Sequence, residues 1–326
     1  MRPELAAWID RLRPGARFEE IAGDASSRRF HRVHPPSGPT CVVMDYGAPF
    51  AGESDDQRLT RIFLEAGLPV AAILAAGPEV GALLLQDLGP TSLEDALSAG
   101  RDPGPLYARA AGLAVRIAVD GTAALARSER AAGPALDAAR FRFEMDFFLE
   151  HYVAGLCGRP ARGLAPRLHA LADAAAASSP PVLCHRDFHS RNLLVRPDGS
   201  LAMVDLQDAR WGPDTYDLAS LLRDAYVDLA EDLLERTLEG ARTALPGPPD
   251  PTGFRSRFDL VATQRMVKAL GTFGYQAGAL GRGRYLSAIP RTLARLERTE
   301  VGDDLRRHGL LALPPGLEKE RGRPGA

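Results

Sequence analysis

The apolar residues of the first 88 positions alternate between helical spacing and short continuous runs. Over 3–13, and again near 53–66, they recur every three or four positions, which predicts two helices. Four short apolar runs are typical of strands and lie at 18–21, 30–33, 41–44 and 82–85. We therefore expect a small antiparallel sheet of three or more strands with one inserted helix.

From residue 89 onward the helical spacing dominates. Helical patterns rich in Ala and Leu cover about 105–127, 136–156 and 163–178, and helices are expected again from about 216 to 298. Thr91 and Glu94 have the spacing of a capping box, which predicts the start of a helix there. Three short strand-like runs interrupt the helices, at 182–184, 193–195 and 201–204.

These patterns predict an α+β fold with two lobes. The first lobe, 1–88, carries the small sheet, and the second, 89–313, is mainly helical. Residues 314–326 are rich in Pro, Gly and charge, so we expect a frayed tail.

Three oxygen-bearing side chains in one window form the candidate chemistry. Asp187 and Asn192 lie five residues apart in a loop between apolar strands, and Asp205 directly follows a later strand. A hairpin of these strands would bring all three side chains to one end. Such oxygen ligands suit Mg²⁺, which prefers one or two carboxylates together with substrate phosphates. A remaining aspartate can accept the proton of an attacking hydroxyl, as phosphoryl transfer requires.

Charge and composition narrow the possible partners. The 326 residues carry 40 basic and 42 acidic side chains, a formal net charge of −2. So weak a net field argues against binding of bulk nucleic acid or of an anionic membrane. No run approaches the roughly 20 apolar residues that span a bilayer, and no apolar signal core opens the chain. Three widely separated cysteines fit a reducing compartment, so we expect a cytoplasmic protein. We also expect a monomer.

The window around Asp187 also resembles a known signature. His185, Asp187 and Asn192 have the order and spacing of a kinase catalytic loop, and His189 completes the form H-x-D-x-H-x-x-N. This form is similar to that of the aminoglycoside phosphotransferase and choline kinase family. The resemblance implies a bilobal protein-kinase-like fold. It also implies that Asp217 steadies the catalytic loop, which is compatible with a helix-capping role. His185 is expected to hold the loop from a buried position, and His189 to shape it.

Several further segments look like the anomeric kinases of bacterial cell-wall recycling, at 23–30, 43–45, 84–89, 205–209, 212–224, 264–268 and 285–293. Those kinases phosphorylate N-acetylmuramate and N-acetylglucosamine at the C1 hydroxyl in peptidoglycan recycling. By this resemblance Asp187 orients and deprotonates the anomeric hydroxyl, and Asn192 and Asp205 hold Mg²⁺ on ATP. The partner would be a small-molecule sugar.

Nucleotide and sugar contacts are expected on either side of this loop. Two segments would hold ATP. One is the turn between the first two strands, with Gly23, Asp24, Ser26, Ser27 and Arg28, and the other is the exit from the last strand of the sheet lobe, with Gln86 and Leu88. For the turn, a solvated hairpin is the alternative interpretation. Sugar contacts are expected from polar residues near the loop, namely Gln207, Arg210, Arg223 and Asp224, for which surface salt bridges or helix caps are the alternative.

One departure from the kinase pattern leaves alternatives open. Kinases usually carry a strand lysine that binds the α- and β-phosphates, but no lysine precedes Lys268 here. Arg28, Arg29 or Arg32 could substitute, the role could be absent, or the chain could be a non-catalytic nucleotide-binding pseudokinase. A kinase of the same fold acting on an aminoglycoside is a further alternative. It is disfavoured because a polycation requires a strongly acidic pocket, whereas 205–224 mixes arginines with its acids.

Overall fold

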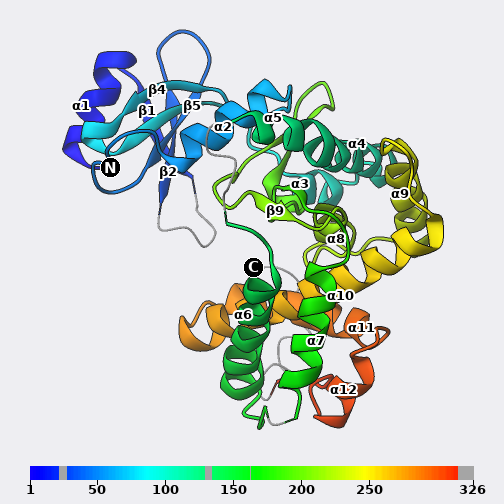
Figure 1. Ribbon diagram of the computed structural model, residues 1–326. Helices are drawn as coiled ribbons and strands as arrows, with labels where there is room; N and C mark the ends of the chain where they lie inside the picture. The colour runs from blue at the N-terminus through cyan, green and yellow to red at the C-terminus, as the bar shows by residue number, and fades with distance from the viewer. Residues whose placement is uncertain (22–27, 129–133, 162, 315–326) are drawn as a thin grey trace.

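The computed structural model describes residues 1–21, 28–128, 134–161 and 163–314, and it has the expected two lobes (Figure 1). The small lobe is built on one antiparallel sheet in the order β1-β2-β3-β5-β4. Its strands are β1 (Arg17–Ile21), β2 (Arg29–His34), β3 (Cys41–Asp45), β4 (Ile73–Gly77) and β5 (Ala82–Gln86). The α+β class and the four expected strands are confirmed.

Strand β4 is the element of the sheet that the sequence pattern did not predict. It reads Ile-Leu-Ala-Ala-Gly, and alanine and glycine have little preference for strands. Its residues alternate between half-buried and exposed, with one irregularity in its register against β5. Pairing with β5 at the edge of the sheet, rather than local preference, therefore forms this strand.

Helix α1 (Pro3–Leu12) covers the sheet and completes the core of the small lobe. Its buried residues Leu5, Trp8 and Ile9 pack against apolar side chains of the sheet, among them Val33 and Val43. A Cβ at Gly77 would lie 2.6 Å from the Trp8 ring, so the end of β4 requires glycine at this contact.

Helix α2 (Asp55–Glu65) lies between β3 and β4 in sequence, as the expected inserted helix, but packs into the core of the helical lobe. Ser54 and Gln57 form a complete capping box at its start. Its apolar face, Leu59, Ile62 and Phe63, joins the larger core rather than that of α1 and the sheet. The segment after it pairs with a strand of the helical lobe, because Met203 donates its N–H to the Pro69 carbonyl at 2.8 Å. Helix α2 thus connects the two lobes.

Ten helices over the described residues form the large lobe: α3 (Leu93–Ser98), α4 (Pro103–Arg116), α5 (Thr122–Arg127), α6 (Ala138–Phe148), α7 (Ala165–Ala176), α8 (Tyr216–Leu222), α9 (Glu231–Ala244), α10 (Pro251–Gly274), α11 (Ile289–Leu296) and α12 (Gly302–Arg307). Helix α10 is the longest and contacts α6, α7, α8, α9 and α11. It crosses the π-helical segment Leu149–Leu156, which continues α6, at close range, since a Cβ at Gly274 would lie 2.6 Å from the His151 carbonyl oxygen. The expected capping box at Thr91 and Glu94 is wrong by one residue, because Ser92 and Asp95 form it.

Two short pairs of strands lie among the helices of the large lobe. Strand β6 (Val182–Cys184) pairs with β9 (Arg210–Gly212), and β7 (Leu193–Val195) pairs with β8 (Leu201–Met203), all antiparallel. Strand β9 was not predicted, because Arg210-Trp211-Gly212 contains no apolar run. Its pairing with β6 forms this strand. Within the described ranges, no helix is both long enough and apolar enough to cross a membrane.

Arg2 and Asp45 link α1 to the sheet, and this ion pair yields a stability prediction. Arg2 Nη2 lies 2.6 Å from Asp45 Oδ1, and the Asp45 side chain is 4% exposed. Burial opposes ionisation of Asp45, but hydrogen bonds from Arg2 and from the Gly47 N–H outweigh it and hold its pKa below the usual value. Because the folded pKa is the lower one, the pair stabilises above about pH 4 and loses that contribution as pH falls through the folded pKa.

We expect Arg2→Met to lower the free energy of unfolding at pH 7 by about 1–3 kcal/mol, because it leaves the Asp45 carboxylate buried without its charged partner. Urea denaturation at pH 7 and at about pH 3 should show a smaller difference from the wild type at the acidic pH. Arg11→Met, on an exposed position of the same helix, is the matched control and should change stability by less than about 0.5 kcal/mol. Equal effects of the two variants would contradict the prediction.

Candidate active site

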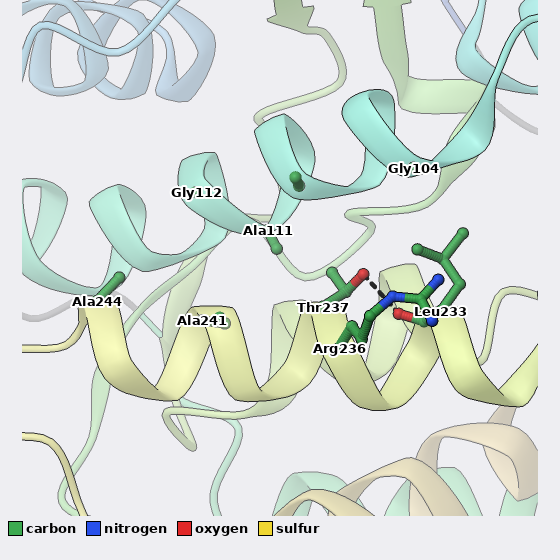
Figure 2. Close-up of a pocket in the computed structure, with 10 residues that line it drawn as sticks. Gly104, Ala111, Gly112, Leu233, Arg236, Thr237, Ala241 and Ala244 are labelled. Atoms are coloured by element: carbon green, nitrogen blue, oxygen red, sulfur yellow. Dashed lines mark hydrogen bonds between the residues drawn. The ribbon is translucent and has the colours of Figure 1, made fainter.

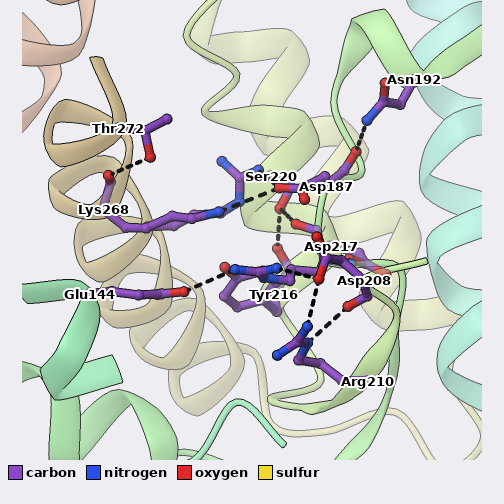
Figure 3. Close-up of polar contacts among 12 residues, drawn as sticks. Glu144, Asp187, Asn192, Asp208, Arg210, Tyr216, Asp217, Ser220, Lys268 and Thr272 are labelled. Atoms are coloured by element: carbon purple, nitrogen blue, oxygen red, sulfur yellow. Dashed lines mark hydrogen bonds and ion pairs between the residues drawn. The ribbon is translucent and has the colours of Figure 1, made fainter. Parts of the chain in front are cut away.

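The loop between β6 and β7 and the end of β8 bring the predicted oxygen-bearing residues together. Asn192 Nδ2 donates a hydrogen bond to the Asp187 carbonyl oxygen at 2.9 Å. Val204 N–H in turn donates to the Asn192 carbonyl oxygen at 3.1 Å, across the end of the β7–β8 pair. Asp205 is the next residue after Val204, so all three lie at one end of this pair. Figure 3 shows the hydrogen bond from Asn192 to Asp187.

Both histidines of the window lie in the interior of the loop. His185 is fully buried, its Nε2 lies 3.0 Å from the Val204 carbonyl oxygen, and its ring meets those of Phe63 and Phe188 edge-on. The ring of His189 contacts that of Tyr226, and burial lowers the pKa of His189. These contacts are those of residues that shape the loop.

Two buried carboxylates hold the backbone of the loop. Asp217, in the first turn of α8, accepts the N–H groups of His185 at 2.7 Å and Arg186 at 3.0 Å. Asp224, which follows α8, accepts the Ser190 N–H at 2.8 Å and the Tyr226 N–H at 2.9 Å. Asp224 is only 2% exposed. Its contacts in the structure are thus those of a loop anchor, while the expected sugar contact stays a prediction.

Two residues of the site have a left-handed backbone that favours glycine: Arg186, with φ of 77°, and Asp205, with φ of 70°. Such strain costs on the order of 1 kcal/mol per residue and persists only where surrounding contacts enforce it. At Arg186 those contacts are ion pairs to Glu144 at 3.4 Å and to Asp208 at 2.9 Å. Arg186 thereby ties the catalytic loop to the segment that follows Asp205.

The carboxylate of Asp187 lies among cations. Lys268 Nζ is 3.4 Å and Arg265 Nη2 is 3.9 Å from Asp187 Oδ1, both reaching from α10. The Asp187 side chain is 25% exposed. Burial opposes its ionisation, but the charges of Lys268, Arg186 and Arg265 outweigh that effect and hold the pKa of Asp187 far below its usual value. Asp187 is therefore an ionised acceptor at neutral pH.

Lys268 and Arg265 were not among the predicted site residues. The sequence held two signals for Lys268. It is one of only two lysines in the chain, and it ends the segment 264–268 that carries part of the resemblance. Their approach to Asp187 arises because α10 passes beside the catalytic loop, although more than 70 residues separate them in sequence.

On the nucleotide side, the predicted Gly23, Asp24, Ser26 and Ser27 lie outside the described residues. Arg28 is described, and its Nη1 lies 3.0 Å from Asp56 Oδ1 of α2. Tyr46 Oη donates to the other Asp56 oxygen at 2.6 Å, and the Arg28 guanidinium lies over the Tyr46 ring. A cation just before β2, paired with a carboxylate of this helix, matches the charges of the lysine–glutamate pair of kinases.

The remaining nucleotide-side residues line the exit from the sheet. Gln86 ends β5, and its N–H donates to the Ala72 carbonyl oxygen at 2.8 Å. Leu88 is buried two residues later. Between them Asp87 pairs with Arg32 at 2.7 Å, whereas Arg28 pairs with Asp56 of α2.

The predicted sugar contacts on the other side engage neighbouring groups. Gln207 Nε2 donates to the carboxylate of Asp205, and Arg210 pairs with Asp208 at 2.7 Å. Arg223 pairs with Glu231 at 2.7 Å. The structure therefore brings Gln207 next to a predicted metal ligand, whereas Arg223 points to a glutamate of α9.

A hollow of about 490 Å³ lies elsewhere, between α4 and α9 (Figure 2). Small side chains such as Ala108, Ala111 and Ala241 line it, together with Arg236 and Thr237. Among the described residues that line it, none belongs to the predicted site. The candidate active site is therefore the polar cluster around Asp187.

We expect Asp217→Asn to loosen the catalytic loop, because an amide offers one acceptor where the carboxylate offers two. Hydrogen exchange of the His185 and Arg186 amides should accelerate about 5- to 150-fold, the ratio expected for a loss of about 1–3 kcal/mol. Asp214→Asn is the matched control, since it removes the Arg257 ion pair without touching the loop. Unchanged exchange in Asp217→Asn would contradict the anchoring role.

Comparison with known proteins shows the family of the chain. The profile of the phosphotransferase enzyme family matches residues 17–254. An N-acetylmuramate/N-acetylglucosamine kinase of Pseudomonas aeruginosa is 31% identical over 318 residues, which cover 94% of this chain and 91% of the relative. The resemblance stated from sequence is thus confirmed.

Solved structures agree in fold. A choline/ethanolamine kinase family protein from Mesorhizobium loti aligns with a TM-score of 0.60 and 16% identity over 95% of this chain and 96% of that one. An amicoumacin kinase in complex with AMP-PNP and Ca²⁺ aligns with a TM-score of 0.56 and 12% identity over 87% and 92% of the two chains. The kinase-like bilobal fold is therefore confirmed, and the chain belongs to the phosphotransferase enzyme family.

Proposed function

We propose that this protein is an ATP-dependent kinase that phosphorylates the anomeric C1 hydroxyl of N-acetylmuramate and N-acetylglucosamine. The observation that carries the proposal is the ionised Asp187 carboxylate beside Asn192 and Asp205, in a chain similar to kinases of these two sugars over nearly their whole length. The product would be a sugar 1-phosphate that serves peptidoglycan recycling. We expect the protein to act as a monomer in the cytoplasm, where its three buried, free cysteines stay reduced.

In this reaction the C1 hydroxyl oxygen forms a bond to the γ-phosphorus as the bond to the β,γ-bridging oxygen breaks and ADP leaves. Asp187 orients the hydroxyl by accepting its hydrogen bond. Because neighbouring cations keep the pKa of Asp187 low, it is a weak base, and it accepts the proton only as the new bond forms. Positioning by the anchored loop therefore contributes more than basicity.

Asn192 and Asp205 suit a magnesium ion shared with the nucleotide. Asn192 uses its Nδ2 toward Asp187, which turns its amide oxygen to serve as a ligand, and the Asp205 side chain is exposed. One amide oxygen and one carboxylate form the sparse protein shell that Mg²⁺ takes when phosphates supply further oxygens. When bound, the ion neutralises charge that develops on the phosphates.

The cations around Asp187 bear on the choice of acceptor. Lys268, Arg265 and Arg186 would repel a polycationic aminoglycoside and accept a neutral or anionic sugar. N-acetylglucosamine is neutral and N-acetylmuramate carries a carboxylate, so both fit this field. The Arg28–Asp56 pair offers a substitute for the missing strand lysine, which argues against a pseudokinase.

Phosphorus NMR of products made from ATP and each sugar tests the proposal. We expect a sugar 1-phosphate from both acceptors in the wild type. Asp187→Asn should lower kcat by about 10³-fold or more, because it removes the group that orients the hydroxyl. Asp146→Asn, an exposed aspartate of α6, is the control and should keep wild-type kcat. Phosphorylation at another position, or activity on aminoglycosides alone, would refute the proposal.

A further inference from the structure

We propose that Lys268 is a catalytic residue that binds the transferring phosphoryl group from the acceptor side of the site. The inference rests on the proposed function to the extent that the acceptor hydroxyl is oriented at Asp187. It assigns to α10, far along the chain, a cation that the sheet lobe does not provide on its central strand.

The geometry places Lys268 at the reacting centre. Its Nζ lies 3.4 Å from Asp187 Oδ1, and Figure 3 shows the side chain reaching toward that carboxylate. The hydroxyl that Asp187 orients must lie within hydrogen-bond reach of this carboxylate. The phosphorus that the hydroxyl attacks must in turn lie in van der Waals contact with the hydroxyl oxygen. A cation beside the same carboxylate oxygen is therefore within reach of a phosphoryl oxygen.

Arg28 offers a substitute for the strand lysine on the nucleotide side, and a cation beside Asp187 adds a second charge on the acceptor side. The β3 strand ends in Asp45, not lysine, and that carboxylate pairs with Arg2. Arg32 pairs with Asp87, and Arg28 pairs with Asp56. In phosphoryl transfer most of the catalysis is electrostatic stabilisation of the transferring group, so a nearby ammonium has a large effect.

Lys268 fits this role better than its neighbour Arg265. The ammonium is compact and has three donors, so it can bind Asp187 and a phosphoryl oxygen at once. Its side chain is 17% exposed, and burial lowers its pKa, so an arriving anion stabilises its charged form. Arg265 is more distant from Asp187, at 3.9 Å, and its guanidinium lies over the Tyr216 ring. Arg265 can help to hold Asp187 in place while Lys268 also binds the phosphoryl group.

The carboxylate of N-acetylmuramate is the other anion that Lys268 could meet, and steady-state kinetics with both sugars distinguishes the two. We expect Lys268→Met to lower kcat about 10²- to 10³-fold with N-acetylglucosamine as well as with N-acetylmuramate, because the phosphoryl group is common to both reactions. Lys268→Arg should recover part of this loss. A loss confined to N-acetylmuramate, or a kcat within about threefold of the wild type on both sugars, would overturn the proposal.

Arg257→Met is the matched control for these kinetics. It removes another half-buried cation of α10, one that pairs with Asp214 instead of Asp187, and it should leave kcat unchanged. Thermal unfolding of Lys268→Met and Lys268→Arg checks that both variants are folded.

Lysine NMR tests the contact without any turnover, and so separates it from the proposed function. Because the chain has only Lys268 and Lys319, protein labelled with ¹³C-lysine gives two side-chain signals, which Lys268→Arg assigns. We expect the Lys268 signal to shift when Mg²⁺, ADP and beryllium fluoride are added, and not with Mg²⁺ and ADP alone. No shift with beryllium fluoride, or the same shift with N-acetylmuramate alone, would overturn the assignment. Failure of the wild type to phosphorylate either sugar would refute only the proposed function.

Discussion

The bonds from Asp217 to the backbone of His185 and Arg186 are the constraint on which the site depends. A buried carboxylate that accepts two backbone N–H groups fixes the direction of the chain just before Asp187. Asp224 does the same just after it, at Ser190. Both carboxylates come from α8 or the residue pair that follows it, so one short helix positions both ends of the catalytic loop. Burial raises the pKa of Asp217, a cost that these N–H groups and nearby positive charge offset in part.

The strained backbone of Arg186 and Asp205 has a consistent explanation in this arrangement. Each carries a polar side chain at a conformation that glycine would adopt more easily. At Arg186 the side chain bridges Glu144 of α6 and Asp208 beyond β8, so replacing it by glycine would relieve strain and lose the bridge. Helix α6, the catalytic loop and the segment of Asp205 are thereby held as one unit. Gln264 of α10 completes it by donating to Glu144 at 2.9 Å.

The electrostatics of the site combine tight positioning with low basicity. Three cations surround Asp187, and their charges favour its ionised form more than burial disfavours it. Such a group orients a hydroxyl well but removes its proton poorly, which suits a reaction whose transition state needs little help from a base. The same cations form a field that favours phosphate and anionic or neutral acceptors. In the small lobe, Arg28, just before β2, pairs with Asp56 of α2, whose apolar face belongs to the core of the large lobe. The two lobes are thus coupled through both a core and an ion pair.

The sequence by itself determined the helical and strand segments with strong periodicity, the two-lobed α+β class, and the trio of Asp187, Asn192 and Asp205. These follow from local spacing, since five residues of loop and one β-strand pair set where the three side chains lie. It did not determine β4 or β9, because their residues have little strand preference of their own and form strands only against a partner. Nor did it reveal Lys268 and Arg265 beside Asp187, Asp56 beside Arg28, or the anchoring contacts of Asp224. Those contacts join residues from 28 to 81 positions apart, and only the packing of α2, α8 and α10 around the loop decides which charges meet.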